Sequence, residues 1–263
     1  YFTYPKTRYK ECPLLYELQC WNAIPRYPPI DERYGGYTGV FTALLKASAN
    51  ALNKPEQLDP ENGLVISKWD IVNTNNYPNL DDIDAVLLTG SKHNSFEDIP
   101  WINRLVEFTQ QVLAQNRVRI LGICFGHQIL GRAMGAKVGR SDQGWEIAVC
   151  DMELTEKGKE IFGLEKIRIQ QMHQDIVASL PQGVTLLGHS PRCAIQGMYA
   201  PRRFISVQGH PEFTEWMETE IIQTRAKTGV FNEDLAQDGL SRVGNEHDGV
   251  AIGTAFLKFL LEE

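Results

Sequence analysis

A cysteine between two glycines is the residue of this sequence best suited to act as a nucleophile. Cys124 follows the apolar run Val118–Ile123, and Gly122 and Gly126 lie two residues away on either side. The residues after it carry apolar side chains at helical spacing. A strand, a sharp turn and a helix in this order expose a reactive side chain at the carboxyl edge of a sheet, and the helix N-terminus favours a thiolate. We therefore expect Cys124 to be a nucleophile.

The best candidate for its base is His210. It follows the apolar strand candidate Phe204–Gln208, and Pro211 stiffens the turn that carries it. Glu212 lies two residues further on, so in an extended chain its carboxylate would point to the same side as the imidazole and hold it in one orientation. An arbitrary cysteine and histidine are more often a core residue and a turn residue. The two strand-end turns together favour catalysis.

The segments that would position these residues alternate between strand and helix. Asp84–Thr89 is a short apolar run typical of a buried parallel strand, and it ends in a loop of turn-forming residues at 90–95. Pro100–Gln115 has helical spacing and leads into the strand before Cys124. This order predicts a doubly wound, mainly parallel α/β sheet with helices on both faces, whose sites lie at the carboxyl ends of strands.

The second half of the chain has a different pattern, with short strand candidates and few helices. These strands predict a small, partly antiparallel addition to the sheet. They are Trp145–Met152, Glu165–Gln171, Val184–Gly188, Cys193–Tyr199 and Phe204–Gln208. Helices are expected at Phe213–Lys227 and Val250–Leu261, with a polar, mobile surface segment at Phe231–Asp248 between them.

The chain divides into an N-terminal segment of uncertain order, residues 1–33, and a single domain, residues 34–263. The N-terminal segment contains one weak strand candidate, Leu14–Trp21. It lacks the apolar region of a secretory signal peptide.

The composition excludes several classes of protein. With 43% hydrophobic and 22% charged residues the chain can bury a full core, and its net charge of −7 argues against nucleic acid or an acidic membrane as the main partner. No apolar run reaches the roughly 20 residues of a membrane span. Five scattered cysteines favour a reducing, cytoplasmic setting. Metal-ligand spacings and nucleotide-binding motifs are absent, so we expect neither a metal nor a cofactor.

Two motifs together resemble a known family. The sequence GICFGHQ at 122–128 and the triplet His210-Pro211-Glu212, whose histidine lies 86 positions after Cys124, are similar to the paired signatures of class I (triad-type) glutamine amidotransferase domains. The resemblance implies a flavodoxin-like α/β fold. It also implies that Cys124, His210 and Glu212 are nucleophile, base and orienting carboxylate.

The resemblance implies further site residues. An oxyanion hole would come from the Gly90–Ser91 loop and the Phe125 amide. Gln128 would contact the amino-acid end of the substrate. His173 and Gln174 would line the substrate cleft.

The loop at Gly90-Ser91-Lys92 differs from the GGP of many amidotransferases. It resembles the stand-alone GMP-synthase-like branch, which includes plant γ-glutamyl peptidases and fungal relatives. This implies hydrolysis of a small γ-glutamyl substrate through a γ-glutamyl thioester. Two alternatives remain open: a glutaminase subunit that delivers ammonia to a separate synthetase, and a catalytically silent scaffold of the same fold.

Overall fold

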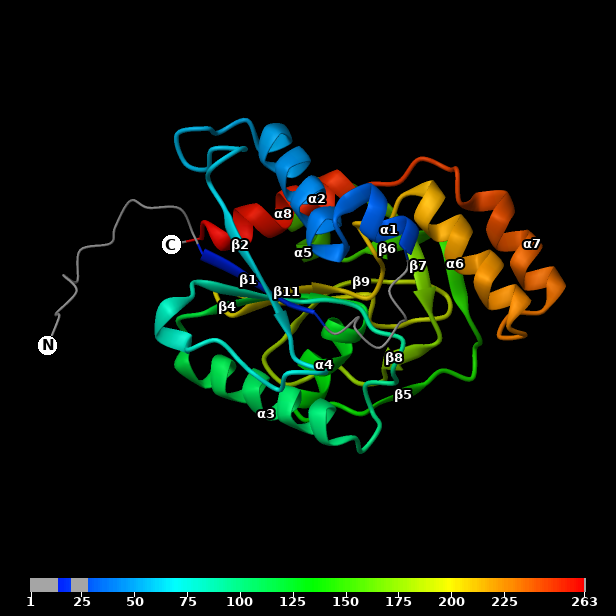
Figure 1. Cartoon of the computed structure of the whole chain (residues 1–263), viewed down its shortest axis with the longest axis horizontal. Coiled ribbons are helices and arrows are strands. Elements are labelled where there is room, and N and C mark those ends of the chain that lie inside the picture. Colours follow the sequence, from blue (N-terminus) through cyan, green and yellow to red (C-terminus); the bar gives the residue numbers. More distant parts are fainter. Residues whose placement is uncertain (1–13, 20–27, 263) are drawn as a thin grey trace, which may run out of the picture.

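One nine-stranded sheet runs through the molecule, with helices on both of its faces (Figure 1). The computed structural model describes residues 14–19 and 28–262. The strand order is β2-β1-β3-β4-β11-β10-β9-β6-β7, and a second sheet pairs β5 with β8. The α/β class predicted from the sequence is confirmed.

The first half of the sheet is parallel and contains the strands that lead into the cysteine turn and the histidine turn. The four pairings β2–β1, β1–β3, β3–β4 and β4–β11 are all parallel. The strands are β1 (Leu14–Gln19), β2 (Val65–Asp70), β3 (Ala85–Leu88), β4 (Arg119–Ile123) and β11 (Phe204–Val207). Their carboxyl ends therefore meet along one edge.

The second half is antiparallel and belongs to the same sheet. Its strands are β10 (Gly197–Ala200), β9 (Thr185–His189), β6 (Glu146–Leu154) and β7 (Lys166–His173), and β5 (Val138–Arg140) pairs with β8 (Asp175–Val177). The prediction of a mainly parallel sheet with a small antiparallel addition therefore underestimated the antiparallel part, which makes up nearly half of the main sheet. Only residues 201–203 separate β10 from β11, and so short a link makes a hairpin, whose strands must be antiparallel.

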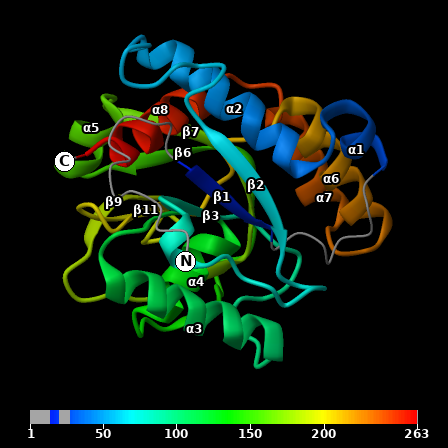
Figure 2. The same ribbon diagram turned by 60° about the vertical axis from the view of Figure 1, so that its left-hand side comes forward.

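The helices form a layer on each side of the sheet. Figures 1 and 2 show α2, α5 and α8 over one face and α3 and α4 over the other, with α6 and α7 beside β6 and β7. Their bounds are α1 Pro28–Tyr34, α2 Tyr37–Leu52, α3 Pro100–Gln115, α4 Phe125–Ala133, α5 Glu156–Phe162, α6 Glu215–Lys227, α7 Glu233–Arg242 and α8 Gly249–Leu260, with a 3₁₀ turn at Leu80–Asp82. The predicted helix at 100–115 is confirmed residue for residue.

The core has two layers, because successive side chains of a strand point to opposite faces. Leu87 of β3 and Leu121 of β4 pack with α2 and α8, whereas Val86 and Ile120 pack with α3 and α4. The continuous apolar runs of these strands are explained by this double burial.

The segment before residue 34 contributes to this architecture. β1 lies inside the sheet, in parallel register with β2 on one side and β3 on the other. Helix α1 contacts α2. The sheet of the domain predicted at 34–263 therefore includes a strand from the segment predicted at 1–33. The remaining part of the predicted strand Leu14–Trp21, residues 20–21, lies outside the described residues.

The segment predicted to be a mobile surface stretch contains helix α7, which the sequence analysis did not predict. The side chain of Asn232 caps the helix by accepting a hydrogen bond from the Leu235 N–H at 2.9 Å. Only Ala236 and Gly239 of the helix are buried. The helix is therefore specified by its cap and by an apolar side, on which Leu235 and Leu240 pack against the core beside the buried Ala236.

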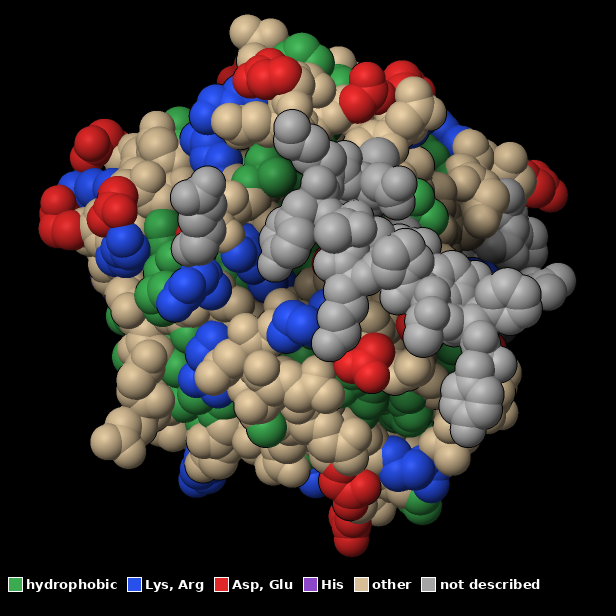
Figure 3. Space-filling model, turned by 90° about the vertical axis from the view of Figure 1, so that its left-hand side faces the viewer, with side chains coloured by type: hydrophobic (Ala, Val, Ile, Leu, Met, Phe, Trp, Pro, Cys, Tyr) green, Lys and Arg blue, Asp and Glu red, His purple; other side chains and the backbone are tan. Residues whose placement is uncertain are grey.

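The surface carries charge of both signs. Figure 3 shows acidic and basic side chains exposed together on one face of the molecule. Among the described residues, none of the helices has the length and apolar character needed to cross a membrane.

The contact between α2 and α8 generates a test of the packing. A Cβ at Gly253 would lie 2.1 Å from Ser48 Oγ, which bonds the carbonyl oxygens of Leu44 and Val250. We expect Gly253→Ala to lower the free energy of unfolding by about 1–3 kcal/mol through overpacking. Urea unfolding measures this, and Ser48→Gly in the same chain should restore part of the loss. A single variant as stable as the wild type would contradict the contact.

Candidate active site

Cys124 occupies a strained turn between β4 and α4. Its φ of 52° and ψ of −103° lie in a region that residues other than glycine rarely adopt. Its N–H donates to the Val207 carbonyl oxygen at 3.0 Å, and its own carbonyl oxygen accepts from the Gln128 N–H at 3.1 Å. Hydrogen bonds to β11 and to the first turn of α4 thus hold the residue. The predicted strand–turn–helix elbow is confirmed.

The two glycines around the cysteine allow close packing of the turn. A Cβ at Gly126 would lie 2.2 Å from the Leu88 carbonyl oxygen at the end of β3, and a Cβ at Gly122 would lie 2.6 Å from Leu130 Cδ1. Any side chain at Gly126 would force α4 away from β3. The glycines therefore fix the position of the elbow against the neighbouring strand.

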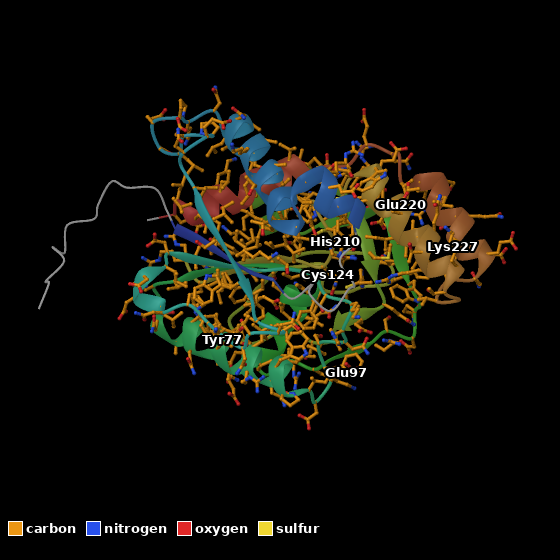
Figure 4. The ribbon with its side chains drawn as sticks, in the orientation of Figure 1. Tyr77, Glu97, Cys124, His210, Glu220 and Lys227 are labelled. Atoms are coloured by element: carbon orange, nitrogen blue, oxygen red, sulfur yellow. The ribbon has the colours of Figure 1, made fainter. Side chains whose placement is uncertain are left out.

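His210 and Glu212 come from the end of the adjacent strand. Because β11 pairs in parallel with β4, the two turns lie at the same edge of the sheet, and Figure 4 shows Cys124 and His210 there. His210 Nδ1 lies 2.8 Å from Glu212 Oε1. The imidazole also stacks on Phe213, with ring centroids 4.0 Å apart. The structure thus brings together the three residues that the sequence singled out.

The charges around His210 raise the pKa of its imidazole. Burial alone would lower its pKa, but the Glu212 carboxylate, the charge of Cys124 and hydrogen bonds to both raise the pKa to about 10. These interactions favour the protonated, imidazolium form of His210. Since Nδ1 is bonded to Glu212, Nε2 is the nitrogen left for Cys124. An imidazolium beside a cysteine favours the nucleophilic thiolate.

A cleft opens over Cys124. It is lined by residues of the loop after β3, the start of α4, the β7–β8 turn, β5 and α6. The residues predicted to form the oxyanion hole and the substrate cleft lie here: Ser91, Phe125, Gln128, His173 and Gln174 line it, and Gly90 is buried directly before Ser91.

The side chain of Gln128 is held from three sides. Its Oε1 accepts from Ser95 Oγ at 2.8 Å, and its Nε2 donates to the Asp175 carbonyl oxygen at 2.8 Å and to Gln208 Oε1 at 3.2 Å. The residue joins the loop after β3, the β7–β8 turn and the end of β11. Its amide therefore stabilises the cleft wall in this structure.

His173 is part of a buried polar group. Its Nε2 lies 3.1 Å from Glu146 Oε2, and Glu146 also accepts from Ser190 Oγ at 2.6 Å and from Gln196 Nε2 at 2.8 Å. Burial would raise the pKa of Glu146, but the hydrogen bond and charge of His173 and the bond from Ser190 lower it. The ring of His173 is thereby fixed at the edge of the cleft.

His127, next to the nucleophile, has a structural role. It lies in the core, where Nδ1 contacts Ser206 Oγ at 2.9 Å and Nε2 contacts the Ile195 carbonyl oxygen at 3.1 Å. Burial lowers its pKa to about 3, with a smaller effect of the same sign from His173. A neutral ring with both nitrogens hydrogen-bonded fits a packing role in the core.

Two residues of α6 at the site were missed in the sequence. Arg225 lines the cleft, and Glu218 is fully buried with Oε1 accepting from the Ala148 N–H at 3.1 Å. Burial raises the pKa of Glu218 to about 7, against the lowering effects of His210, the Ala148 N–H and Arg225. The two residues lie two helical turns apart and so share one face. That spacing, just after the histidine turn, was the signal available.

Comparisons with known proteins agree with this geometry. The family described as glutamine amidotransferase class-I matches residues 59–227. A putative glutamine amidotransferase-like protein of Schizosaccharomyces pombe is 36% identical over 94% of this chain and 99% of that protein. Gamma-glutamyl peptidase 4 of Arabidopsis thaliana is 29% identical over 78% of this chain and 79% of that protein.

Two more distant similarities concern a shorter segment and the fold. A subunit of the glutamine-hydrolyzing GMP synthase of Thermococcus kodakarensis is 37% identical over 97 residues, which are 36% of this chain and 51% of that protein. The crystal structure of a glutamine amidotransferase from Thermotoga maritima has a TM-score of 0.67 to this chain. The match covers 94% of this chain and 98% of the other at 16% sequence identity, so it shows a shared fold.

The close approach of α4 to β3 predicts the effect of one methyl group. We expect Gly126→Ala to lower the free energy of unfolding by about 1–3 kcal/mol and to move the elbow, because the Leu88 backbone blocks the new Cβ. Gly139→Ala is the matched control, since nothing lies within 4 Å of its Cβ position. Equal stability of the two variants in chemical unfolding would contradict this packing.

The raised pKa of His210 predicts a pH dependence of stability. Folding raises this pKa from its ordinary value of 6.5 to about 10, so protonation of His210 stabilises the folded state fully below about pH 6.5, and this contribution is lost as the pH rises through about 10. Glu212→Gln removes the charge that raises the pKa. The variant should therefore lose less stability than the wild type between about pH 7 and pH 10.

Unfolding by urea at several pH values measures both proteins. Glu218 has a pKa of about 7 that responds to both His210 and Glu212, so the two proteins are compared in a Glu218→Gln background, where the remaining groups far from Glu212 cancel in the difference. Parallel stability curves for wild type and Glu212→Gln would show that Glu212 does not hold the proton on His210.

Proposed function

Since the chain belongs to the class I glutamine amidotransferase family, we propose that it is a cysteine-dependent hydrolase of γ-glutamyl amide bonds. The observation that carries the proposal is the arrangement of the three residues at the sheet edge. Cys124 stands in a strained elbow, and a buried histidine hydrogen-bonded to Glu212 lies beside it. This is the geometry of an activated nucleophile, its acid–base partner and an orienting carboxylate.

The proposed reaction has two halves. The Cys124 thiolate attacks the γ-carbonyl carbon, and the imidazolium of His210 gives its proton to the departing amine as the C–N bond breaks. This leaves a γ-glutamyl thioester. Neutral His210 then takes a proton from water, whose oxygen attacks the thioester, and the γ-glutamyl acid and the Cys124 thiolate are released. Glu212 keeps the imidazole in one orientation throughout.

The negative oxygen of each tetrahedral intermediate needs donors. We assign them to the amides of the Gly90–Ser91 loop and of Phe125, which lie beside Cys124 at the end of β3 and the start of α4. Donors on two such elements are fixed before the substrate arrives, which is what an oxyanion hole requires. Gln128, His173 and Gln174 would position the substrate from the cleft wall. Neither a metal nor a cofactor enters any step.

The leaving group distinguishes two versions of this activity. A stand-alone γ-glutamyl peptidase is favoured, because the relative of that name matches along 78% of the chain. A glutaminase that passes ammonia to a separate synthetase is the second candidate, and the GMP synthase relative supports it over a shorter segment.

The cysteines bear on the compartment in which the protein would act. Among the described residues, Cys124, Cys150 and Cys193 have free thiols. A catalytic thiol suits action in the reducing cytoplasm.

The activity is tested with purified protein and two kinds of substrate. We expect γ-glutamyl dipeptides to be hydrolysed with a higher kcat/KM than glutamine. Cys124→Ala should abolish turnover of both. Cys150→Ala is the matched control, because Cys150 lies in β6 outside the cleft, and it should retain the wild-type rate.

Each result separates the alternatives. A preference for glutamine would favour the glutaminase version. Full activity of Cys124→Ala would refute the nucleophile. Absence of hydrolysis, together with no labelling of Cys124 by a glutamine-analogue electrophile, would favour the silent scaffold.

A further inference from the structure

A partly buried cation lines the cleft from α6. Arg225 lines the cleft together with Cys124, Trp145 and Met172. Its guanidinium carbon lies 4.9 Å from the centre of the Trp145 ring and 5.6 Å from that of Phe231. Aromatic rings on this side hold the planar guanidinium in place.

Part of this guanidinium lacks a partner. Arg225 Nη1 is buried and makes no hydrogen bond to any described residue. A buried donor of this kind is costly, and binding sites are where such donors remain available for a ligand. Burial lowers the pKa of Arg225, and the charges of Cys124 and Glu218 oppose this. Arginine keeps its charge in proteins, so the group attracts an anion.

Another part of the cleft lining has a different character. There Arg140 Nε lies 2.9 Å from Asp175 Oδ1, and Arg140 Nη2 donates to Asn94 Oδ1 at 2.8 Å. A paired cation and anion suit the ammonium and carboxylate of a zwitterion, such as the amino-acid end of a γ-glutamyl group. Arg225 instead lies over the rings of Trp145 and Phe231. A cation on an aromatic wall suits a lone carboxylate.

From this asymmetry we propose that Arg225 binds a carboxylate on the leaving-group side of Cys124. The inference rests on the proposed function and narrows its substrate to γ-glutamyl amides whose amine part is itself an amino acid or peptide with a free carboxylate. A guanidinium donates two parallel hydrogen bonds to such a group. Ammonia carries no carboxylate, so this site favours γ-glutamyl peptides over glutamine.

A general electrostatic effect on Cys124 must be separated from recognition. Arg225 lies close enough for its charge to interact with that of Cys124, so its removal can slow the attack on every substrate. Recognition of a carboxylate instead affects only substrates that carry one. The ratio of two substrates with the same scissile bond isolates recognition.

The experiment compares γ-glutamylglycine with γ-glutamylglycinamide. In the wild type we expect kcat/KM to be about 10- to 100-fold higher for the free carboxylate, the range of a charge-assisted hydrogen-bonded pair. Arg225→Met should bring the ratio close to one, and Arg225→Lys should retain part of it. Lys227→Met is the matched control on the same helix, because Lys227 is exposed and Figure 4 shows it at the outer end of α6. It should keep the wild-type ratio.

Binding provides a second readout that needs no turnover. In Cys124→Ala, calorimetric titration should give tighter binding of γ-glutamylglycine than of its amide, and adding Arg225→Met should remove the difference. Equal affinity for the two ligands would overturn the inference, as would an equal loss of activity toward both substrates in Arg225→Met. A binding preference without hydrolysis would refute the proposed function and leave the carboxylate site standing.

Discussion

The parallel pairing of β4 with β11 is the interaction on which the site depends. It sets Ile123 beside Val207, so the next residues of both strands leave the sheet at the same edge. The Val207 carbonyl oxygen continues the ladder by accepting the Cys124 N–H. A cysteine and a histidine that are far apart in the sequence are thereby placed by backbone hydrogen bonds of the central sheet. Rigid elements hold the reacting groups, and loops only extend them.

The antiparallel half of the sheet completes the cleft. It carries Glu146 on β6 and His173 on β7, and Ser190 and Gln196 lie at the ends of β9 and β10. These polar side chains bond one another under the cleft, where burial without partners would be costly. The strands that were predicted to be a small addition therefore support one wall of the site, and α6 places Arg225 over Trp145 next to it.

The parts that sequence reasoning reached were local. The Cys124 elbow, the His210 turn and the helix at 100–115 are each encoded by neighbouring residues. The proportion of antiparallel pairing was missed because it depends on which distant strands meet. Helix α7 was missed because the many polar residues of 231–248 outweighed its spaced apolar side chains, Leu235, Ala236, Leu240 and Val243. Arg225 was missed because its spacing from Glu218 does not show which face of α6 meets the cleft, and only tertiary packing places it over Trp145.

The contact between Gly126 and the Leu88 carbonyl oxygen has a mechanical consequence. With a Cβ position only 2.2 Å from that oxygen, the start of α4 and the end of β3 cannot slide past each other. The loop that begins at Thr89 and the amide of Phe125 therefore move as one body. In the proposed mechanism these two elements supply the donors for the oxyanion. The close backbone contact between α4 and β3 therefore also fixes the distance between the two donors.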